Sequence, residues 1–279
     1  MFESPVKTRD LILFSFFSLM IIFFIFLSSF FDERTKIIFC NVGQGDAIYI
    51  RLENKIDVLI DTGPDKSILS CLGKYMPFWD RKIELALLSH PNNDHYNGYF
   101  FIIDRYQIDK FITVNSSIIS KTYKKLLNKI SEKKIPLLFN VSGNEIKVGD
   151  GQFLFYWPPA KFTSVNDNDF SSVILFSVGG REKSFRLLFT GDASSFILSR
   201  LSHGAIGKID VLKIPHHGSK NGLTKKFLDL ADPSIAVISV GKNNSYGHPA
   251  QVVLDMLKAK NVNIRRTDEE GDIVFKIKD

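Results

Sequence analysis

The stretch Leu87-Leu88-Ser89-His90-Pro91-Asn92-Asn93-Asp94-His95 holds two histidines and an aspartate within six positions, after a hydrophobic run that begins at Ile83. The run has the length of a buried strand. Pro91 lacks an N–H and keeps the preceding residue out of the helical region, so the chain must turn here. The two histidines and the aspartate can therefore converge at the end of the strand, where imidazole and carboxylate together suit zinc, manganese or iron. A polar surface loop with unrelated histidines is the alternative, since short motifs give many false matches.

A second stretch, from Leu11 to Phe31, has no charged residue and contains eight of the 25 phenylalanines in this chain of 279 residues. As a helix with a rise of about 1.5 Å per residue it would span roughly 30 Å, the hydrocarbon thickness of a bilayer. No face of it is polar, which argues against a core helix. A cleaved signal peptide is the rival interpretation, although its apolar region is usually shorter. The sequence predicts an N-terminal tail over 1–10, a transmembrane anchor over 11–31 and one large domain over 36–279.

The flanks of the anchor give only a slight bias in orientation, because Lys7 and Arg9 precede it while Arg34 and Lys36 follow it. We expect a single-pass protein of the inner (cytoplasmic) membrane, with the short tail inside and the large domain extracytoplasmic. The net charge of +6 mildly favours anionic partners. No protein partner is predictable.

The two cysteines, Cys40 and Cys71, can form at most one disulfide. Cys40 lies inside a strand-like run, and we predict that it is a small buried hydrophobe. Neither cysteine fits a CxxC metal site.

Polar clusters recur where strand-like runs end, and five of the six histidines, all but His203, lie in them. The clusters are Asp61, His90 to His95, Asp192, His216-His217 and His248. Strands come first, then alternating strands and helices, in two halves; this order predicts two paired sheets with helices outside. Loops at one edge of such sheets can converge on a common site. We expect an amphipathic helix within 117–134, whose lysine-rich face is a solvated surface rather than a contact for nucleic acid or lipid.

Six motifs occur in order along the chain. They are Val42-Gly43-Gln44-Gly45-Asp46-Ala47, Ile60-Asp61-Thr62-Gly63, Ser89 to His95, Thr190-Gly191-Asp192-Ala193, Pro215-His216-His217-Gly218-Ser219 and Tyr246-Gly247-His248-Pro249. Together they resemble the metallo-β-lactamase-like domain of the ComEC-type DNA-uptake proteins, over 36–279. The resemblance implies an αββα sandwich with a two-metal hydrolytic site at its edge. ComEC-type proteins also carry many membrane spans that form a DNA channel, and a chain with one predicted span cannot be that channel.

The resemblance also implies the roles of individual residues. His90 would bind the first metal ion; Asp94, His95 and one of His216 and His217 would bind the second, with His216 preferred and His217 left open. Asp192 would bridge the two ions, and Asp61 would orient the ligand loops. The catalytic group implied is Asp94, Asp192 and His248, and the substrate contacts implied are Ser219, Asn243, Asn244 and His248. A histidine that only starts a helix and bonds to backbone is the alternative for His248.

Two positions depart from the family pattern. Asn92 stands where these families have a stronger ligand, and Asn168 stands where an isolated ligand histidine is expected. An amide is a weaker ligand than a carboxylate or an imidazole. Both residues are therefore weak candidate ligands, and we expect the first metal site to be the weaker one.

The function implied is a membrane-anchored, metal-dependent phosphodiesterase or nuclease. It would act on DNA or another anionic phosphodiester through a metal-bound hydroxide, with two divalent ions, Zn²⁺ or Mn²⁺. A small phosphoester hydrolase of the phosphorylcholine type is an alternative, since sites of this kind are reused across chemistries. A non-catalytic binding module that has lost its metal is a third hypothesis, motivated by Asn92 and Asn168.

Overall fold

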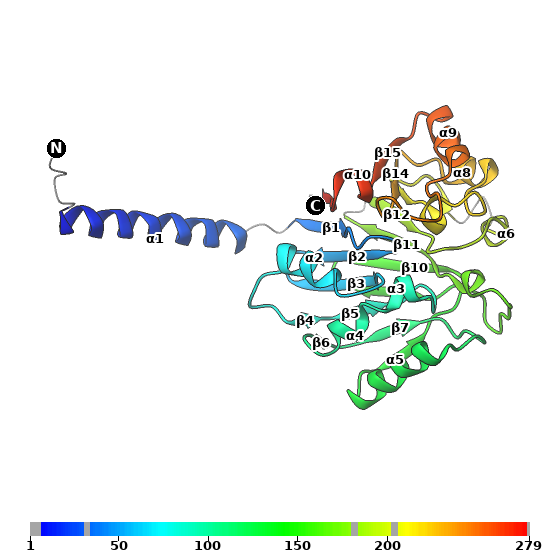
Figure 1. The fold of residues 1–279 in the computed structure, drawn as a ribbon, viewed down its shortest axis with the longest axis horizontal. Helices are drawn as coiled ribbons and strands as arrows, with labels where there is room; N and C mark the ends of the chain where they lie inside the picture. The colour runs from blue at the N-terminus through cyan, green and yellow to red at the C-terminus, as the bar shows by residue number, and fades with distance from the viewer. Residues whose placement is uncertain (1–6, 31–33, 180–183, 202–205, 278–279) are drawn as a thin grey trace.

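The strands of the chain are rich in apolar side chains on both faces, as in β2 (Ala47–Leu52), where all six residues are buried. Such strands need cover on both sides. The computed structural model, which describes residues 7–30, 34–179, 184–201 and 206–277 (of 25–30 the backbone alone), provides it with two seven-stranded sheets lying face to face and helices outside them (Figure 1). The predicted paired-sheet architecture is confirmed.

The first sheet has the order β16-β1-β2-β3-β5-β7-β8. Its strands are Ile273–Ile277, Thr35–Phe39, Ala47–Leu52, Ile56–Thr62, Leu85–Leu87, Phe111–Thr113 and Leu137–Phe139. The second sheet has the order β15-β14-β13-β12-β11-β10-β9. Its strands are Asn263–Arg266, Ile235–Ile238, Val211–Lys213, Phe185–Phe189, Val173–Val178, Gly151–Trp157 and Glu145–Val148. A separate pair joins β4 (Lys82–Ile83) to β6 (Gln107–Ile108).

Short helices follow many of the strands. They are α2 (Ile68–Tyr75), α3 (Asn93–Tyr96), α4 (Tyr99–Ile102), α5 (Lys121–Glu132), η1 (Asp167–Phe170), α6 (Ser195–Leu198), η2 (Pro215–Gly218), α8 (Lys225–Ala231), α9 (Gln251–Ala259) and α10 (Thr267–Glu270). The core has three parts. One lies between the sheets and includes Phe39, Phe153 and Phe176, and the other two lie beneath the helices of each half.

The edge of the sandwich is where polar loops gather. In the first sheet β3, β5 and β7 run parallel, and in the second β12, β13 and β14 run parallel. The carboxyl ends of parallel neighbours meet at one edge, so the loops after β5, β12, β13 and β14 come together there. The site described below is built from these loops.

The predicted membrane anchor requires a correction. A helix, α1 (Thr8–Phe30), occupies most of that stretch, but it begins at Thr8, and its first turn therefore contains Arg9 and Asp10. Among the residues that the structure describes, no helix is both long enough and apolar enough to cross a bilayer. The transmembrane span and the single-pass insertion are therefore not supported; residue 31 and the tail residues 1–6 lie outside the described residues.

The prediction for the cysteines also requires a correction. Cys40 and Cys71 form a disulfide, with their Cα atoms 5.8 Å apart. Cys40 follows β1, and Cys71 lies on the face of α2 that packs on the first sheet. Cys40 is buried as predicted, and Cys71 is buried as well. Docking of the helix on the sheet brings the sulfur atoms together, which their spacing in the sequence does not reveal.

Candidate metal centre

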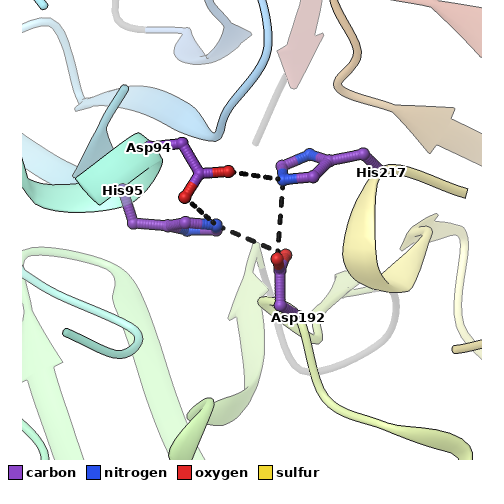
Figure 2. A group of neighbouring side chains, drawn as sticks. All are labelled: Asp94, His95, Asp192 and His217. Carbon is purple, nitrogen blue, oxygen red and sulfur yellow. Dashed lines mark hydrogen bonds and ion pairs between the residues drawn. The ribbon is translucent and has the colours of Figure 1, made fainter. Parts of the chain in front are cut away.

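Four side chains from three loops meet at the edge of the sandwich. Asp94 and His95 come from α3, Asp192 from the loop after β12, and His217 from η2 (Figure 2). One ligand atom of each lies within 4.8 Å of those of the others. The Nε2 atom of His95 is 3.3 Å from Asp192 Oδ1, and the Nε2 atom of His217 is 3.3 Å from Asp94 Oδ2 and 3.5 Å from Asp192 Oδ2. We call these four residues the carboxylate side of the site.

Each histidine of the carboxylate side is fixed through its other ring nitrogen. The Nδ1 atom of His95 lies 2.8 Å from Asp61 Oδ2, and that of His217 lies 2.8 Å from the carbonyl oxygen of Ser239. A ring that donates from Nδ1 to a fixed acceptor presents Nε2 to the site, which is the usual arrangement behind metal-binding histidines.

Asp61 anchors the loop that carries these ligands. Besides its contact with His95, it accepts hydrogen bonds from the backbone N–H of Ser89 and from the Ser89 hydroxyl, both at 2.7 Å. The residue is buried. This geometry fits the orienting role that the resemblance implied for Asp61.

The sequence predicted one ligand from the pair His216-His217 and preferred His216; the structure places His217 in the four-residue group instead. Both residues have left-handed backbone conformations, with φ of 51° and 53°. This bend turns His217 inward, where it is 2 % exposed, and leaves the His216 side chain 29 % exposed. The preference for His216 is corrected on this point.

A buried ion pair lies behind the carboxylate side. The ammonium group of Lys213, on β13, contacts the carboxylate of Asp46, donates to the carbonyl oxygen of Gly191 at 2.9 Å and lies 3.9 Å from Asp192 Oδ1. Asp46 in turn lies 3.5 Å from the Nδ1 atom of His217 and 3.8 Å from that of His95. The pair therefore contacts three of the four residues of the carboxylate side.

The loop of Asp46 reaches this position because of Gly45, which has φ of +147°. A Cβ atom at Gly45 would lie 2.3 Å from the carbonyl oxygen of Asp94. Only glycine allows this approach of the two backbones.

The electrostatic environment makes the carboxylate side strongly ionised. Burial raises the pKa of Asp192, but His217, His95 and Lys213 outweigh it and hold the pKa well below its usual value. Burial lowers the pKa of His217, but Asp192 and Asp46 outweigh it and raise the pKa to about 10. Burial also lowers the pKa of His95, but the carboxylates of Asp192 and Asp61 outweigh it and raise the pKa well above its usual value. In the metal-free protein the imidazole rings of His95 and His217 are therefore protonated at neutral pH. A bound metal cation would displace these protons.

These residues fit a divalent metal ion. The buried atoms His95 Nε2 and Asp192 Oδ1 have no hydrogen-bond partner, and buried polar atoms seldom remain unpaired unless something else binds them. Two imidazole nitrogens and two carboxylates form a donor set suited to zinc or manganese. The other acidic group of the described residues, Asp46 with Asp61 and His95, fits less well because Lys213 is paired with Asp46.

Four further residues adjoin the carboxylate side, and we call them the amide side of the site: His90, Asn92, Asn168 and His216. His90 is buried, its Nδ1 atom lies 3.0 Å from the Ser89 hydroxyl, and its Nε2 atom has no hydrogen-bond partner. His216 Nε2 lies 3.8 Å from Asp192 Oδ2. Burial and the neighbouring His95 lower the pKa of His90 to about 3, so its ring is neutral and can bind a metal ion at neutral pH.

The two asparagines of the amide side make local contacts. The side chain of Asn92 caps α3 by accepting a hydrogen bond from the backbone N–H of Asn93 at 2.9 Å. The Nδ2 atom of Asn168 lies 3.4 Å from His216 Nδ1. Among the histidines, cysteines and acidic residues that the structure describes, no close group of three includes His90 or His216.

A cleft of roughly 590 Å³ opens over both sides of the site. Its lining includes Asp94, Asp192, His216, His217 and His248. The remaining lining residues are Val42, Gly43, Gln44, Pro64, Asp65, Asn92, Asn93 and Tyr246. No lysine or arginine is among them, so the cleft offers negative charge until cations bind.

His248 lies in this cleft, 5.7 Å from His216 between ring centres. Burial, with His216 and His217, lowers the pKa of His248. A neutral ring at neutral pH suits donation of a hydrogen bond to substrate better than protonation of a leaving group. The Nδ1 atom has no hydrogen-bond partner.

The other predicted substrate contacts are placed outside the cleft lining. The side-chain amide of Asn244 makes its hydrogen bonds within its own loop. Its Nδ2 atom donates to the carbonyl oxygens of Gly241 and His248, and its Oδ1 atom accepts from the backbone N–H groups of Tyr246 and His248. The Ser219 hydroxyl accepts from the backbone N–H of Asn221 at 3.3 Å. Asn243 is exposed, with a left-handed φ of 56°. Asn244 is therefore a loop-forming residue, which corrects its predicted role as a substrate contact.

Three residues of the site had no role in the sequence interpretation: Asp46, Lys213 and Tyr246. Asp46 and Tyr246 lie inside motifs that were noted only as part of the resemblance. Lys213 gave a usable signal, because a charged residue within an otherwise apolar strand requires a buried partner. The sequence did not reveal which carboxylate that partner would be.

The fold and the site together define a metallo-β-lactamase-fold protein with a histidine–carboxylate centre for a divalent metal ion. The structure resembles YhfI, a metallo-β-lactamase-fold protein from Bacillus subtilis, with a TM-score of 0.60 and 11 % identity over 88 % of this chain and 100 % of that one. It also resembles CmlA, a diiron β-hydroxylase from Streptomyces venezuelae, with a TM-score of 0.58 and 13 % identity over 88 % of this chain and 54 % of that one. At such identities the likeness concerns the fold alone.

The chain is similar in sequence to proteins of the ComEC type, which confirms the resemblance found in the motifs. It is 26 % identical to ComE operon protein 3 of Bacillus subtilis over 92 % of its length, 28 % identical to Recombination protein 2 of Haemophilus influenzae over 84 %, and 24 % identical to competence protein ComA of Neisseria gonorrhoeae over 88 %. These matches cover 35 %, 28 % and 32 % of the relatives, so the chain spans about a third of their length. No family model matches the chain.

Proposed function

We propose that this protein is a metal-dependent phosphodiesterase that acts on DNA or another anionic phosphodiester. The observation that carries the proposal is the group Asp94, His95, Asp192 and His217, whose ligand atoms lie within 4.8 Å of one another. All but His95 line an open cleft. The similarity to competence proteins supports nucleic acid as the substrate. The whole-length relatives are about three times longer, so their activities apply to this chain only as part of this proposal.

The residues of the carboxylate side would hold one ion, and His90 and His216 would face a second ion from the amide side, with Asp192 between the two. When bound, such ions polarise a phosphoryl oxygen and lower the pKa of water toward neutrality. Asp61 and Ser239 fix the two histidine rings, and Lys213 with Asp46 fixes the loop of Asp192. His248 would donate a hydrogen bond to a phosphoryl oxygen or to the leaving oxygen.

The charges in the cleft explain why activity would depend on metal. Asp65, Asp94 and Asp192 line the cleft, and among the other lining residues only the protonated ring of His217 offsets their charge in the metal-free protein. A phosphodiester is therefore repelled by the metal-free cleft and attracted only when cations offset the carboxylates. The proposal thus predicts loss of both substrate binding and hydrolysis on chelation.

The compartment proposed is an oxidising one, outside the cytoplasm. The buried Cys40–Cys71 disulfide supports it, because structural disulfides persist in oxidising compartments and are rare in the cytosol. Denaturing the cells in the presence of an alkylating reagent tests this, because unfolding exposes both buried cysteines: they should escape modification unless a reductant is added first.

The function itself is tested on the purified full chain. Metal content is measured after chelation and after addition of Mn²⁺ or Zn²⁺, and hydrolysis is followed on a single-stranded oligonucleotide, on bis-p-nitrophenyl phosphate and on phosphorylcholine. Metal-dependent cleavage of the two diesters, with phosphorylcholine left intact, is the expected result. Cleavage of phosphorylcholine alone would instead identify a small phosphoester hydrolase. A protein that binds neither metal would be the non-catalytic module.

A further inference from the structure

One residue of the cleft plays no part in the chemistry described above. Tyr246 lines the cleft together with Asp94 and Asp192, yet it is 69 % exposed. Large exposed aromatic residues elsewhere on the described surface, such as Phe78, Phe139 and Phe196, do not line this cleft. Single exposed apolar residues are common on protein surfaces, so it is the position of Tyr246 at the cleft, and not its exposure, that points to a contact with substrate.

The loop that carries Tyr246 is held in one shape. Asn244 makes four hydrogen bonds within the loop, two as donor at 2.6 and 3.0 Å and two as acceptor at 3.0 and 3.2 Å, and one of the latter comes from the backbone N–H of Tyr246. The ring of Tyr246 is therefore attached to a pre-organised backbone. A contact made by such a ring loses little conformational entropy on binding.

The ring is also supported from one side. Tyr246 stacks on His248, with 5.8 Å between ring centres and 23° between planes. With most of the residue exposed, the remainder of the ring is open to solvent beside the histidine that faces the cleft. A flat partner placed there would lie next to the proposed scissile phosphate.

The absence of lysine and arginine from the cleft lining limits the kinds of flat partner that could bind beside Tyr246. A strand bound by its phosphates alone needs lysine or arginine contacts, and none lines the cleft. Stacking of bases on aromatic side chains is the other general source of affinity for single strands, and it tolerates any base because every base has a π-face.

We propose that Tyr246 forms a nucleobase-stacking subsite at the mouth of the cleft, so that the preferred substrate is a phosphodiester carrying an unpaired base beside the scissile bond. This inference rests on the proposed phosphodiesterase function and specifies its substrate class. A base in a duplex is stacked on its neighbours, so the subsite selects single-stranded nucleic acid over duplexes and over diesters without bases.

The experiment compares a fluorescent single-stranded oligonucleotide with a strand of the same length built from abasic nucleotides. The full-length wild type is compared with Tyr246→Ala, with Tyr246→Phe, which keeps the ring, and with Phe78→Ala, an exposed aromatic outside the cleft. Dissociation constants from anisotropy and kcat/KM with Mn²⁺ are both measured. Stacking is worth about 1–3 kcal/mol per base, so wild type should prefer the ordinary strand by roughly 5- to 150-fold.

Tyr246→Ala should reduce that preference to near unity, while Tyr246→Phe and Phe78→Ala should keep it. An equal loss on both strands in Tyr246→Ala would overturn the subsite, because it would show that the ring only positions His248. Absence of any preference in wild type would overturn it as well. A protein that binds the ordinary strand with this preference but does not cut it would refute the phosphodiesterase function and leave the base subsite standing.

Discussion

The carboxylate side and the amide side of the centre share Asp192 but are built differently. On the carboxylate side, three ionised or ionisable partners surround Asp192, and each histidine is oriented by a fixed oxygen acceptor, Asp61 for His95 and Ser239 for His217. On the amide side, His90 is oriented by the Ser89 hydroxyl and His216 by the Asn168 amide at 3.4 Å. The carboxylate side therefore holds both of its rings at 2.8 Å, whereas the amide side holds one ring at 3.0 Å and the other at 3.4 Å.

The difference shows how charge and pre-organisation combine in a metal site. A carboxylate attracts a divalent cation more strongly than an amide does, and orienting contacts behind a ligand are worth roughly 10- to 100-fold in metal affinity. Both effects favour the carboxylate side, so we expect its metal ion to bind more tightly.

Replacing Asp192, the residue that both sides share, should weaken metal binding on both sides. Asp192→Asn removes the charge that faces both sides, and we expect metal binding to weaken by about 3 kcal/mol or more, roughly 100-fold, with loss of phosphodiester hydrolysis. Metal content after dialysis and turnover on an oligonucleotide measure these effects. Asp65→Asn, an exposed carboxylate of the same cleft, is the control. A variant Asp192→Asn with wild-type metal content would show that the assignment is wrong.

Breaking the ion pair behind the carboxylate side should affect stability first and metal affinity second. Lys213→Met leaves the buried carboxylate of Asp46 without its cation, and loss of one partner of a buried pair costs about 3–5 kcal/mol of unfolding free energy. The double variant Asp46→Asn/Lys213→Met removes both charges and should regain most of that stability, while its metal affinity stays about 10-fold below wild type.

Urea unfolding of the metal-free protein and metal titration give the two quantities separately. Lys82→Met serves as the control, because the ion pair of Lys82 with Asp109 is partly exposed and such pairs are worth about 0–1 kcal/mol. Equal stability of Lys213→Met and wild type would contradict a structural role for the pair.

The pH dependence should also distinguish the two sides. The pKa of His217 is raised from its ordinary 6.5 to about 10, so between these values the metal-free native state holds a proton that the unfolded state has lost. The stabilisation is complete below pH 6.5 and is lost as the pH rises toward 10. Unfolding free energy should fall by about 1.4 kcal/mol per pH unit for this group.

Denaturant midpoints of the chelated protein measured from pH 7 to 10 test this slope. With saturating metal, the cation replaces the proton, so the slope should largely disappear. His90, whose pKa is lowered to about 3, contributes nothing to the slope in this range. A metal-free protein with constant stability from pH 7 to 10 would contradict the predicted protonation of His217.

The smallest effect is expected from strengthening the amide side. Asn92→Asp supplies a carboxylate at the cleft while preserving the helix cap, since aspartate caps as well as asparagine. We expect the weaker metal ion to bind up to about 10-fold more tightly, seen as a lower Mn²⁺ concentration for half-maximal activity. Asn93→Asp adds the same charge one position later, where the side chain is bonded to the Tyr96 hydroxyl, and should have less effect. If the unmodified protein binds two metal ions with equal affinity, the amide side is not the weaker site and the prediction is wrong.

Much of this site was determined by the sequence alone. Polar residues follow the strand-like sequence runs that end at Leu88, Phe189 and Ile214, and the carboxyl ends of parallel strands share an edge, so the pattern itself predicts where the site lies. The pattern of residue types within 89–95 is equally local, because Pro91 forces the turn that groups them. The pairing of two sheets likewise follows from strands without a polar face.

The remaining features were decided by contacts between segments distant in the sequence. The ligand at η2 depends on two consecutive left-handed residues, which put His217 rather than His216 inside. Asp46 lies in the loop before β2 of the first sheet and Lys213 on β13 of the second, and Cys40 and Cys71 lie at a strand end and in a helix, so their pairing exists only after packing. The local sequence determines which residues need a partner, since burying an unpaired charge is costly. The packing of the sheets and helices determines which partner each one meets.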